Sequence, residues 1–375
     1  MRRYLSILAL LVAVCLTFQC AAIAQAAAPR ISDKEFWRMV TEFSEDGGFF
    51  PFENFVSNED AFVAVIPNLN KETKTGGAYF GVGPEQNFTY INALQSKIAF
   101  ILDIRRQNMI EHLLYKVMFE MSENRVAFLS RLFSRSIPEG LTEESTANEL
   151  FQKFRSVKAD QTQYETNLKE AIDRIKGHGF TITEEDEKSI AFVYTAFFKG
   201  GPQLNYTFDP AIQSRPSPRE LMPSYENLMV SKDGSGKQQS YLASEGNFRF
   251  IRDMQRNNLI VPLVGDFAGP KAIRAAGTYL KGAGITVSVF YTSNVEQYLF
   301  EEAGKWRRFY DNVGSLPLDE SSTFIRANST GRLSTYQPAG VTGRWLSLTC
   351  PIVDLLHNVE SGQIQNYYDV FAFSH

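Results

Sequence analysis

Glycines, acids and an amide follow several short apolar segments of this sequence, which is the pattern of a small-molecule site. Gly81 and Gly83 follow one such segment, and Asp103 follows the next one. Asp266 and Asn294 follow two later apolar segments. In an open parallel sheet, ligands bind beyond the carboxyl ends of the strands. We therefore expect these five residues to lie together at one edge of a sheet.

The glycines and the acid that follows them suggest a nucleotide. A Gly-x-Gly turn lets the backbone approach a ligand and enter the next helix tightly. Asp103 comes about 20 positions after Gly81, where an acid commonly accepts hydrogen bonds from ribose hydroxyls. Gln86 stands where a dinucleotide motif has its third glycine, which argues against NAD. The alternative is an ordinary parallel sheet with glycine-containing turns and surface acids.

Charged neighbours complete the candidate site. Glu85 lies in the turn after Gly83 and is a further candidate for cofactor contact. Arg105 and Arg106 can clamp an anionic ligand, because guanidinium groups bind carboxylate or phosphate through paired hydrogen bonds. The alternative for the arginines is a solvated start of a helix beside Asp103.

Other motifs argue against several chemistries. The segment 233–237 resembles a phosphate loop, but Ser231 and Gln238 replace residues that such a loop requires, so we expect a turn. The four histidines are scattered and lack partners at metal-ligand spacing, so no metal site is predicted. Cys350 is expected to be structural. No Gly-x-Ser-x-Gly motif anchors a hydrolase triad.

Alternating strands and helices are expected to position the site. The unbroken apolar run 98–103 is typical of a strand buried on both faces, and residues 106–121 have helical spacing. Further strands are expected at 61–66, 78–83, 259–266, 285–291, 323–327 and 345–348. This order predicts an α/β fold with a Rossmann-like, mostly parallel sheet.

The segment of about residues 122–240 interrupts that order. Helical patterns at 125–133, 147–154, 161–175 and 183–198 precede a proline-rich stretch. We interpret the segment as a helical insertion within a single domain that spans residues 27–375.

The N-terminus predicts export. Arg2 and Arg3 precede an apolar stretch, residues 5–18, that is shorter than the roughly 20 residues of a membrane-spanning helix. Small residues up to position 26 suit signal cleavage. We expect a signal peptide at residues 1–26, a periplasmic or secreted protein, and no stable membrane span after cleavage. The alternative is an uncleaved anchor.

The overall composition is that of a globular protein without a nucleic-acid surface. The chain has 375 residues, of which 44% are hydrophobic, which is enough for a sizeable core. Its formal net charge is −4, and acids and bases are mixed along the chain. No basic patch suggests nucleic acid as a partner.

Four segments resemble those of an uncharacterised bacterial family of hypothetical proteins, over about residues 31 to 330. The segments are 81–90, 103–108, 265–271 and 293–298. That family looks like a variant of the class I S-adenosylmethionine methyltransferase fold. The resemblance implies that Gly81 and Gly83 face the methionine and ribose, that Asp103 binds the ribose hydroxyls, and that Asp266 and Asn294 lie beside the transferring group.

The chain also departs from the methyltransferase pattern. The first strand lacks the acid that usually precedes the glycine loop, and no third strand with an adenine-contacting residue is found in the insertion. Two functions therefore stay open. One is S-adenosylmethionine-dependent transfer to a small molecule, and the other is non-catalytic periplasmic ligand binding or interaction on a degenerate methyltransferase fold. S-adenosylmethionine is a cytoplasmic cofactor, which conflicts with the predicted export.

Overall fold

The computed structural model describes residues 30–207, 222–329 and 344–375. The predicted signal peptide, residues 1–26, lies outside these ranges. A six-stranded sheet forms the centre, in the order β3-β2-β1-β4-β5-β6. Its strands are β1 (Ala78–Gly81), β2 (Ile98–Asp103), β3 (Ile260–Val264), β4 (Val287–Ser293), β5 (Thr323–Ser329) and β6 (Trp345–Pro351).

The sheet is parallel from β3 to β5, and β6 pairs with β5 in the antiparallel direction at the edge. Every residue of β1, β2 and β3 is buried, as their unbroken apolar runs predict. Parallel strands need cover on both faces, and an antiparallel edge strand is a common addition. The predicted α/β class with a Rossmann-like, mostly parallel sheet is confirmed.

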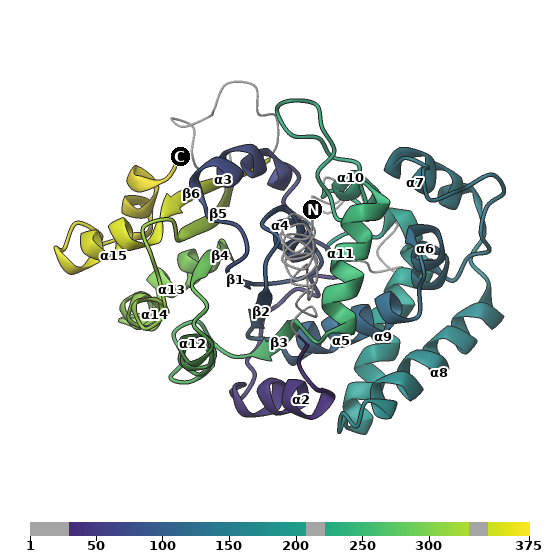
Figure 1. Ribbon diagram of the computed structural model, residues 1–375, viewed down its shortest axis with the longest axis horizontal. Coiled ribbons are helices and arrows are strands. Elements are labelled where there is room, and N and C mark those ends of the chain that lie inside the picture. Colours follow the sequence, from purple (N-terminus) through teal and green to yellow (C-terminus); the bar gives the residue numbers. More distant parts are fainter. Residues whose placement is uncertain (1–29, 208–221, 330–343) are drawn as a thin grey trace, which may run out of the picture.

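Helices cover both faces of this sheet (Figure 1). The helices are α2 (Asp33–Glu42), α3 (Ile66–Glu72), α4 (Gln86–Ala93), α5 (Arg106–Glu120), α6 (Arg125–Phe133), α7 (Ala147–Ser156), α8 (Gln161–Gly177), α9 (Glu184–Gly200), α10 (Tyr225–Met229), α11 (Glu245–Arg256), α12 (Ala272–Ala283), α13 (Val295–Glu301), α14 (Lys305–Gly314) and α15 (Ile352–Glu360), with 3-10 helices η1 (Phe62–Val65), η2 (Gly201–Gln203) and η5 (Tyr367–Phe373).

Aromatic rings connect the sheet to its helices. Phe80 of β1 lies between Phe100 of β2 and Phe290 of β4, with ring centroids 5.4 and 5.2 Å apart. Tyr279 of α12 packs on Phe100 from the same face. On the side of α4, α5 and α11, Phe88 contacts several further rings. Such pairs add about 0.5–1.5 kcal/mol each beyond area burial.

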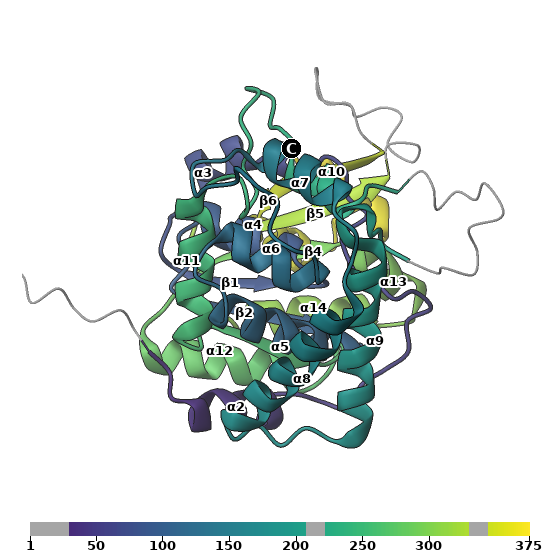
Figure 2. The ribbon, with the colours of Figure 1, turned by 90° about the vertical axis from the view of Figure 1, so that its right-hand side faces the viewer.

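The stretch from α6 to α10 lies outside α5 and does not join the sheet. α8 and α9 pack directly on α5, and α6 packs on α8 and α9. Figure 2 shows these helices as an outer layer in front of α5. Thr183 is the N-cap of α9 and forms a capping box with Asp186.

One predicted strand is wrong. The strand predicted at 61–66 is instead the 3-10 helix η1, Phe62–Val65, and α3 begins at Ile66 with Pro67 in its first turn. A short apolar run cannot be assigned to strand or helix by periodicity alone. Proline suits the first turn of a helix because its missing N–H would have no partner there.

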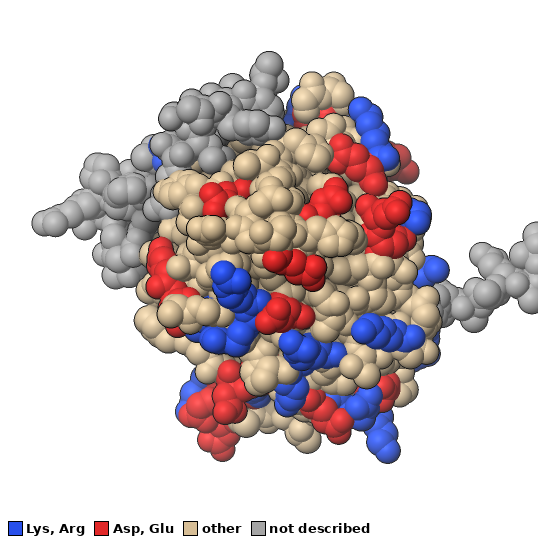
Figure 3. Space-filling view, turned by 90° about the vertical axis from the view of Figure 1, so that its left-hand side faces the viewer, with Lys and Arg blue, Asp and Glu red and all other residues tan. Residues whose placement is uncertain are grey.

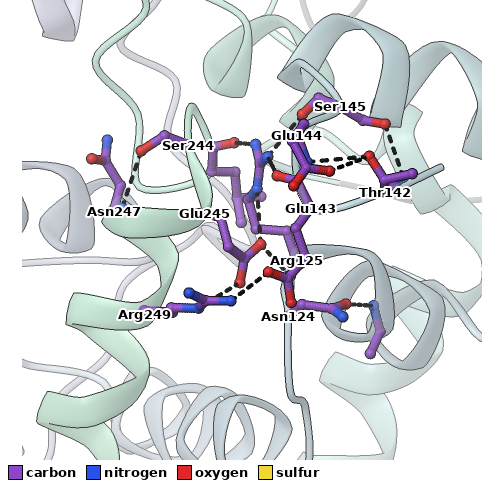
Figure 4. A network of polar contacts seen from close by, with 12 residues as sticks. Asn124, Arg125, Thr142, Glu143, Glu144, Ser145, Ser244, Glu245, Asn247 and Arg249 are labelled. Carbon is purple, nitrogen blue, oxygen red and sulfur yellow. Dashed lines mark hydrogen bonds and ion pairs between the residues drawn. The ribbon is translucent and has the colours of Figure 1, made fainter.

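A polar network attaches this outer layer to α11 (Figure 4). Arg125, at the start of α6, bonds to Glu245 through its backbone N–H and its Nε, at 3.2 and 3.3 Å. The same guanidinium donates to the carbonyl oxygens of Leu242, Glu143 and Ser145. The Arg125 side chain is only 3% exposed. Arg249 contacts the same two glutamates but is 48% exposed.

We expect Arg125→Met to lower the free energy of unfolding by about 3–5 kcal/mol, because it removes the buried guanidinium that pairs with Glu245 and donates to three carbonyl oxygens, and leaves Glu245 only the exposed Arg249 at 3.5 Å. Arg249→Met is the matched control and should cost about 1 kcal/mol or less, since exposed pairs contribute little. Urea denaturation of both variants measures the difference. Equal losses would show that the buried pair does not hold α6 on α11.

A second cluster joins α2, α5 and the end of α8. His178 Nε2 lies 2.7 Å from Glu120, and its Nδ1 lies 3.0 Å from Asp33. Hydrogen bonding to Glu120, and then to Asp33, raises the pKa of His178 above its ordinary value. Burial opposes ionisation of Glu120, but His178 and Lys116 outweigh it and lower the pKa of Glu120 to about 2.

Because the pKa of His178 is raised on folding, its stabilising effect is complete below the ordinary value of 6.5 and disappears as the pH rises through the folded value. His178→Gln should therefore cost more stability at pH 6 than at pH 9. Urea midpoints at both pH values measure this, with exposed His357→Gln as control. A cost that does not change with pH would contradict the assignment.

Candidate ligand-binding site

A cavity of about 470 Å³ lies at the carboxyl ends of the strands. Gly83 after β1, Asp103 at the end of β2, Asp266 after β3 and Asn294 after β4 all line it. The strand-end residues that the sequence indicated are thus brought together from segments far apart in the chain. A cavity of this size suits a small molecule.

The two glycines of the β1 turn have different roles. Gly83 has a φ of +76°, and a side chain added there would meet nothing within 4 Å. Gly81 does not line the cavity, and an added Cβ would lie 1.9 Å from Asn87 Oδ1. The Asn87 amide donates to the carbonyl oxygens of Val82 and Pro84 and so holds the turn. Gly83 leaves room for a ligand, whereas Gly81 makes room for Asn87.

Asp103 and Arg105 form a bidentate ion pair. Arg105 Nη2 lies 2.9 Å from Asp103 Oδ2, and Nε and the backbone N–H of Arg105 both donate to Oδ1. The same guanidinium donates to the carbonyl oxygen of Glu53 and lies 5.9 Å from the ring of Phe50. Arg105 therefore fixes the segment 50–53, which borders the cavity, and is not available as a free anion clamp.

Arg106 lies outside the cavity lining. Its guanidinium forms two hydrogen bonds with Asp186, at 2.7 and 2.8 Å. This pair connects α5 to the start of α9. Of the two arginines, only Arg105 is part of the site.

Asp266 follows the third strand of the sheet, β3, which pairs with β2. The third strand therefore exists, but it comes after the insertion and not within it. The carboxylate of Asp266 pairs with Lys305 at 3.1 Å. Chain order alone could not identify β3 as the neighbour of β2, because the insertion separates the two strands in sequence.

The end of β4 has an unusual backbone. Ser293 has a φ of +51°, which is rare for a residue with a side chain and is found at functional sites. Asn294 follows it as the N-cap of α13 and lines the cavity. Ser293 Oγ donates to Glu59 at 2.5 Å, a contact that holds the strained residue in place.

Glu59 is a lining residue that the sequence did not reveal. Besides Ser293, the hydroxyl of Tyr291 donates to it at 2.7 Å, and the Gln86 amide does so at 2.8 Å. Burial raises the pKa of Glu59, and the three hydrogen bonds oppose this rise. Its position before the first strand, in an irregular segment, offered no periodicity that could identify it.

An aromatic loop covers the cavity and was also missed. Its residues 49–52 read Phe-Phe-Pro-Phe, and the Phe49 side chain is 87% exposed. Phe50 packs edge-on against Tyr298 at 5.7 Å, and Phe52 lies 5.8 Å from Tyr206. The only sequence signal was a cluster of aromatic residues after a Gly-Gly pair.

Glu85, predicted to contact a cofactor, is the N-cap of α4 and is not among the lining residues. Its side chain is fully buried, and burial raises its pKa to about 8. Glu111 of α5 is also buried, and burial, followed by the charge of Glu85, raises its pKa well above the ordinary value. His112 contacts the carbonyl oxygen of Gly83 at 2.9 Å. His112, on α5, is therefore the group of these three that holds the turn after β1.

Metal binding, membrane spans, the cysteine and the surface charge of the described residues also bear on the function. In residues 30–207, 222–329 and 344–375, no group of three or more His, Cys, Asp or Glu residues is arranged to hold a metal. Within the same ranges, no helix is both long and apolar enough to cross a membrane. Cys350 is buried with a free thiol. On the face in Figure 3, basic and acidic side chains are interspersed.

The sheet order and the strand-end cavity define a Rossmann-like α/β protein with a helical outer layer. Residues 54–361 match the family model described as Domain of unknown function (DUF7790). The chain therefore belongs to this family. No curated protein matches it.

Glu85 gives a prediction about the buried start of α4, next to the site. In the folded protein it keeps its proton up to about pH 8, whereas its ordinary pKa is 4.5. The folded state therefore binds more protons between these values, and stability falls as the pH rises. Glu85→Gln should gain stability relative to the wild type from pH 5 to pH 8. Urea titrations measure this, with exposed Glu301→Gln as control, and a gain that does not depend on pH would disprove the assignment.

Proposed function

We propose that this protein binds a small molecule in the strand-end cavity and that S-adenosylmethionine is the first candidate. The observation that carries the proposal is the meeting of Gly83, Asp103, Asp266 and Asn294 around one cavity. The parallel order β3-β2-β1-β4 places that cavity where Rossmann-like folds bind nucleotides.

The residues fit a nucleoside in size and shape. A cavity of about 470 Å³ with aromatic walls can hold a planar base and a sugar, and the open Gly83 lets the backbone approach it. Asp103 fits in part. Its Oδ2 accepts one bond, from Arg105, and a carboxylate oxygen can accept two, so one ribose hydroxyl has an acceptor there.

S-adenosylmethionine would supply a methyl group to an acceptor molecule. The chain would supply position: Gly83 and Asp103 at the nucleoside, and Asn294 at the end of β4 for the acceptor. The resemblance implied that Asp266 lies beside the transferring group. Because Asp266 follows β3, on the far side of β2 from β1 and β4, we propose the adenine side for it instead. Orientation of two reactants can provide much of a rate enhancement, so this reaction requires no protein nucleophile.

The second candidate is a non-catalytic ligand-binding protein on the same fold. The ion pair between Asp103 and Arg105 favours it, because that pair occupies most of the carboxylate. The predicted signal peptide at residues 1–26 favours it as well, since a periplasmic or secreted protein is separated from the cytoplasmic cofactor.

Calorimetric titration with S-adenosylmethionine and S-adenosylhomocysteine tests the proposal. We expect binding by the wild type and a loss of affinity of about tenfold or more in Asp103→Asn, or about 1.4 kcal/mol. Exposed Asp354→Asn on α15 is the control, and circular dichroism checks that each variant is folded. Absence of binding by the folded wild type at millimolar ligand would exclude this cofactor and favour the second candidate.

A further inference from the structure

The charges around the cavity do not balance. Among the lining residues that the structure describes, four are acidic and two are basic, namely Glu59, Asp103, Asp266, Glu302, Arg105 and Lys305. Arg105 is paired with Asp103, while Lys305 is paired with both Asp266 and Glu302. Glu59 is left with neutral hydrogen-bond donors. The cavity lining therefore has an excess of acidic side chains, and Glu59 is the one without a cationic partner among the described residues.

Glu59 is held as an oriented carboxylate. Tyr291 and Ser293 donate to Oε1, and Gln86 donates to Oε2, so Oε2 keeps capacity for one more bond. The side chain is 1% exposed to solvent although it lines the cavity. Burying a carboxylate without a cation is costly, and a bound positive charge would remove that cost.

The walls of the cavity are rich in aromatic residues, and one of them, Tyr291, contacts this carboxylate. Tyr291 and the loop residues Phe50 and Phe52 line the cavity, together with Tyr206, Tyr298 and Trp345. Aromatic faces attract cations, and ammonium groups are recognised by aromatic walls in this way. Aromatic walls and an unpaired carboxylate together select for positive charge on an apolar body.

We infer that the ligand of this cavity is an organic cation, an ammonium or a sulfonium compound, whose charge lies against Glu59. The inference rests on the proposed function, that the cavity binds a small molecule, and deepens it by naming the charge of the ligand. A bare Ca²⁺ or Mg²⁺ ion fits less well, because such ions take six or more oxygen ligands and Glu59 offers one free acceptor position.

Two matched pairs of probes test the inference by calorimetry on the full chain. The first pair is S-adenosylmethionine, which carries a sulfonium, and S-adenosylhomocysteine, which carries a neutral thioether. The second pair is choline and 3,3-dimethylbutan-1-ol, its uncharged carbon isostere. In the wild type, we expect the cation of at least one pair to bind about tenfold tighter than its neutral partner.

Glu59→Gln should abolish that preference while the neutral partner binds as before. Glu302→Gln is the matched control, since it removes an equal charge from the same lining at a residue already paired with Lys305. It should keep the preference. Tyr291→Phe, which leaves the carboxylate, should also keep it, and thermal unfolding verifies that each variant is folded.

Equal affinity for cation and neutral partner in the wild type would overturn the inference and leave small-molecule binding intact. A preference that survives in Glu59→Gln would also overturn the role of Glu59. If none of the four probes binds at millimolar concentration, both the inference and the proposed cofactor fail. If Glu59→Gln does not fold, the affinities for cation and neutral partner are compared in the wild type and in Tyr291→Phe. This comparison still decides whether the cavity prefers a cationic ligand.

Discussion

The parallel alignment of β3, β2, β1 and β4 is the constraint on which the rest of the molecule depends. Parallel strands have their carboxyl ends at one edge, so the turn after each strand must open on the same side. Because every strand residue of β1 to β3 is buried, polar groups can appear only where the strands end. The cavity therefore collects the polar side chains that the sheet itself excludes.

Four carboxylates at this edge show how one functional group takes different roles. Asp103 is neutralised by Arg105 and holds a loop, and Asp266 is neutralised by Lys305. Glu85 is buried at the start of α4, where burial favours the protonated form. Glu59 faces the cavity with neutral donors around it. Of these four acids, only Glu59 both faces the cavity and lacks a cationic partner in the described lining.

The helical outer layer explains why the chain is long for its sheet. More than a hundred residues separate β2 from its neighbour β3, and α6 to α9 pack outside α5 in that interval. Buried contacts such as those of Arg125 attach this layer to α11. Tyr206, from the same interval, reaches the cavity, so the layer also contributes to the site.

The sequence by itself determined the α/β class, most strand positions and the meeting of Gly83, Asp103, Asp266 and Asn294. It could do so because buried parallel strands are continuous apolar runs and because parallel strands end at one edge. Only the tertiary structure decided the neighbours of each strand and the partners of each charge. Such pairings join residues far apart in the chain: Glu59 meets Ser293, and β3 meets β2, because packing brings them together and no local pattern encodes it.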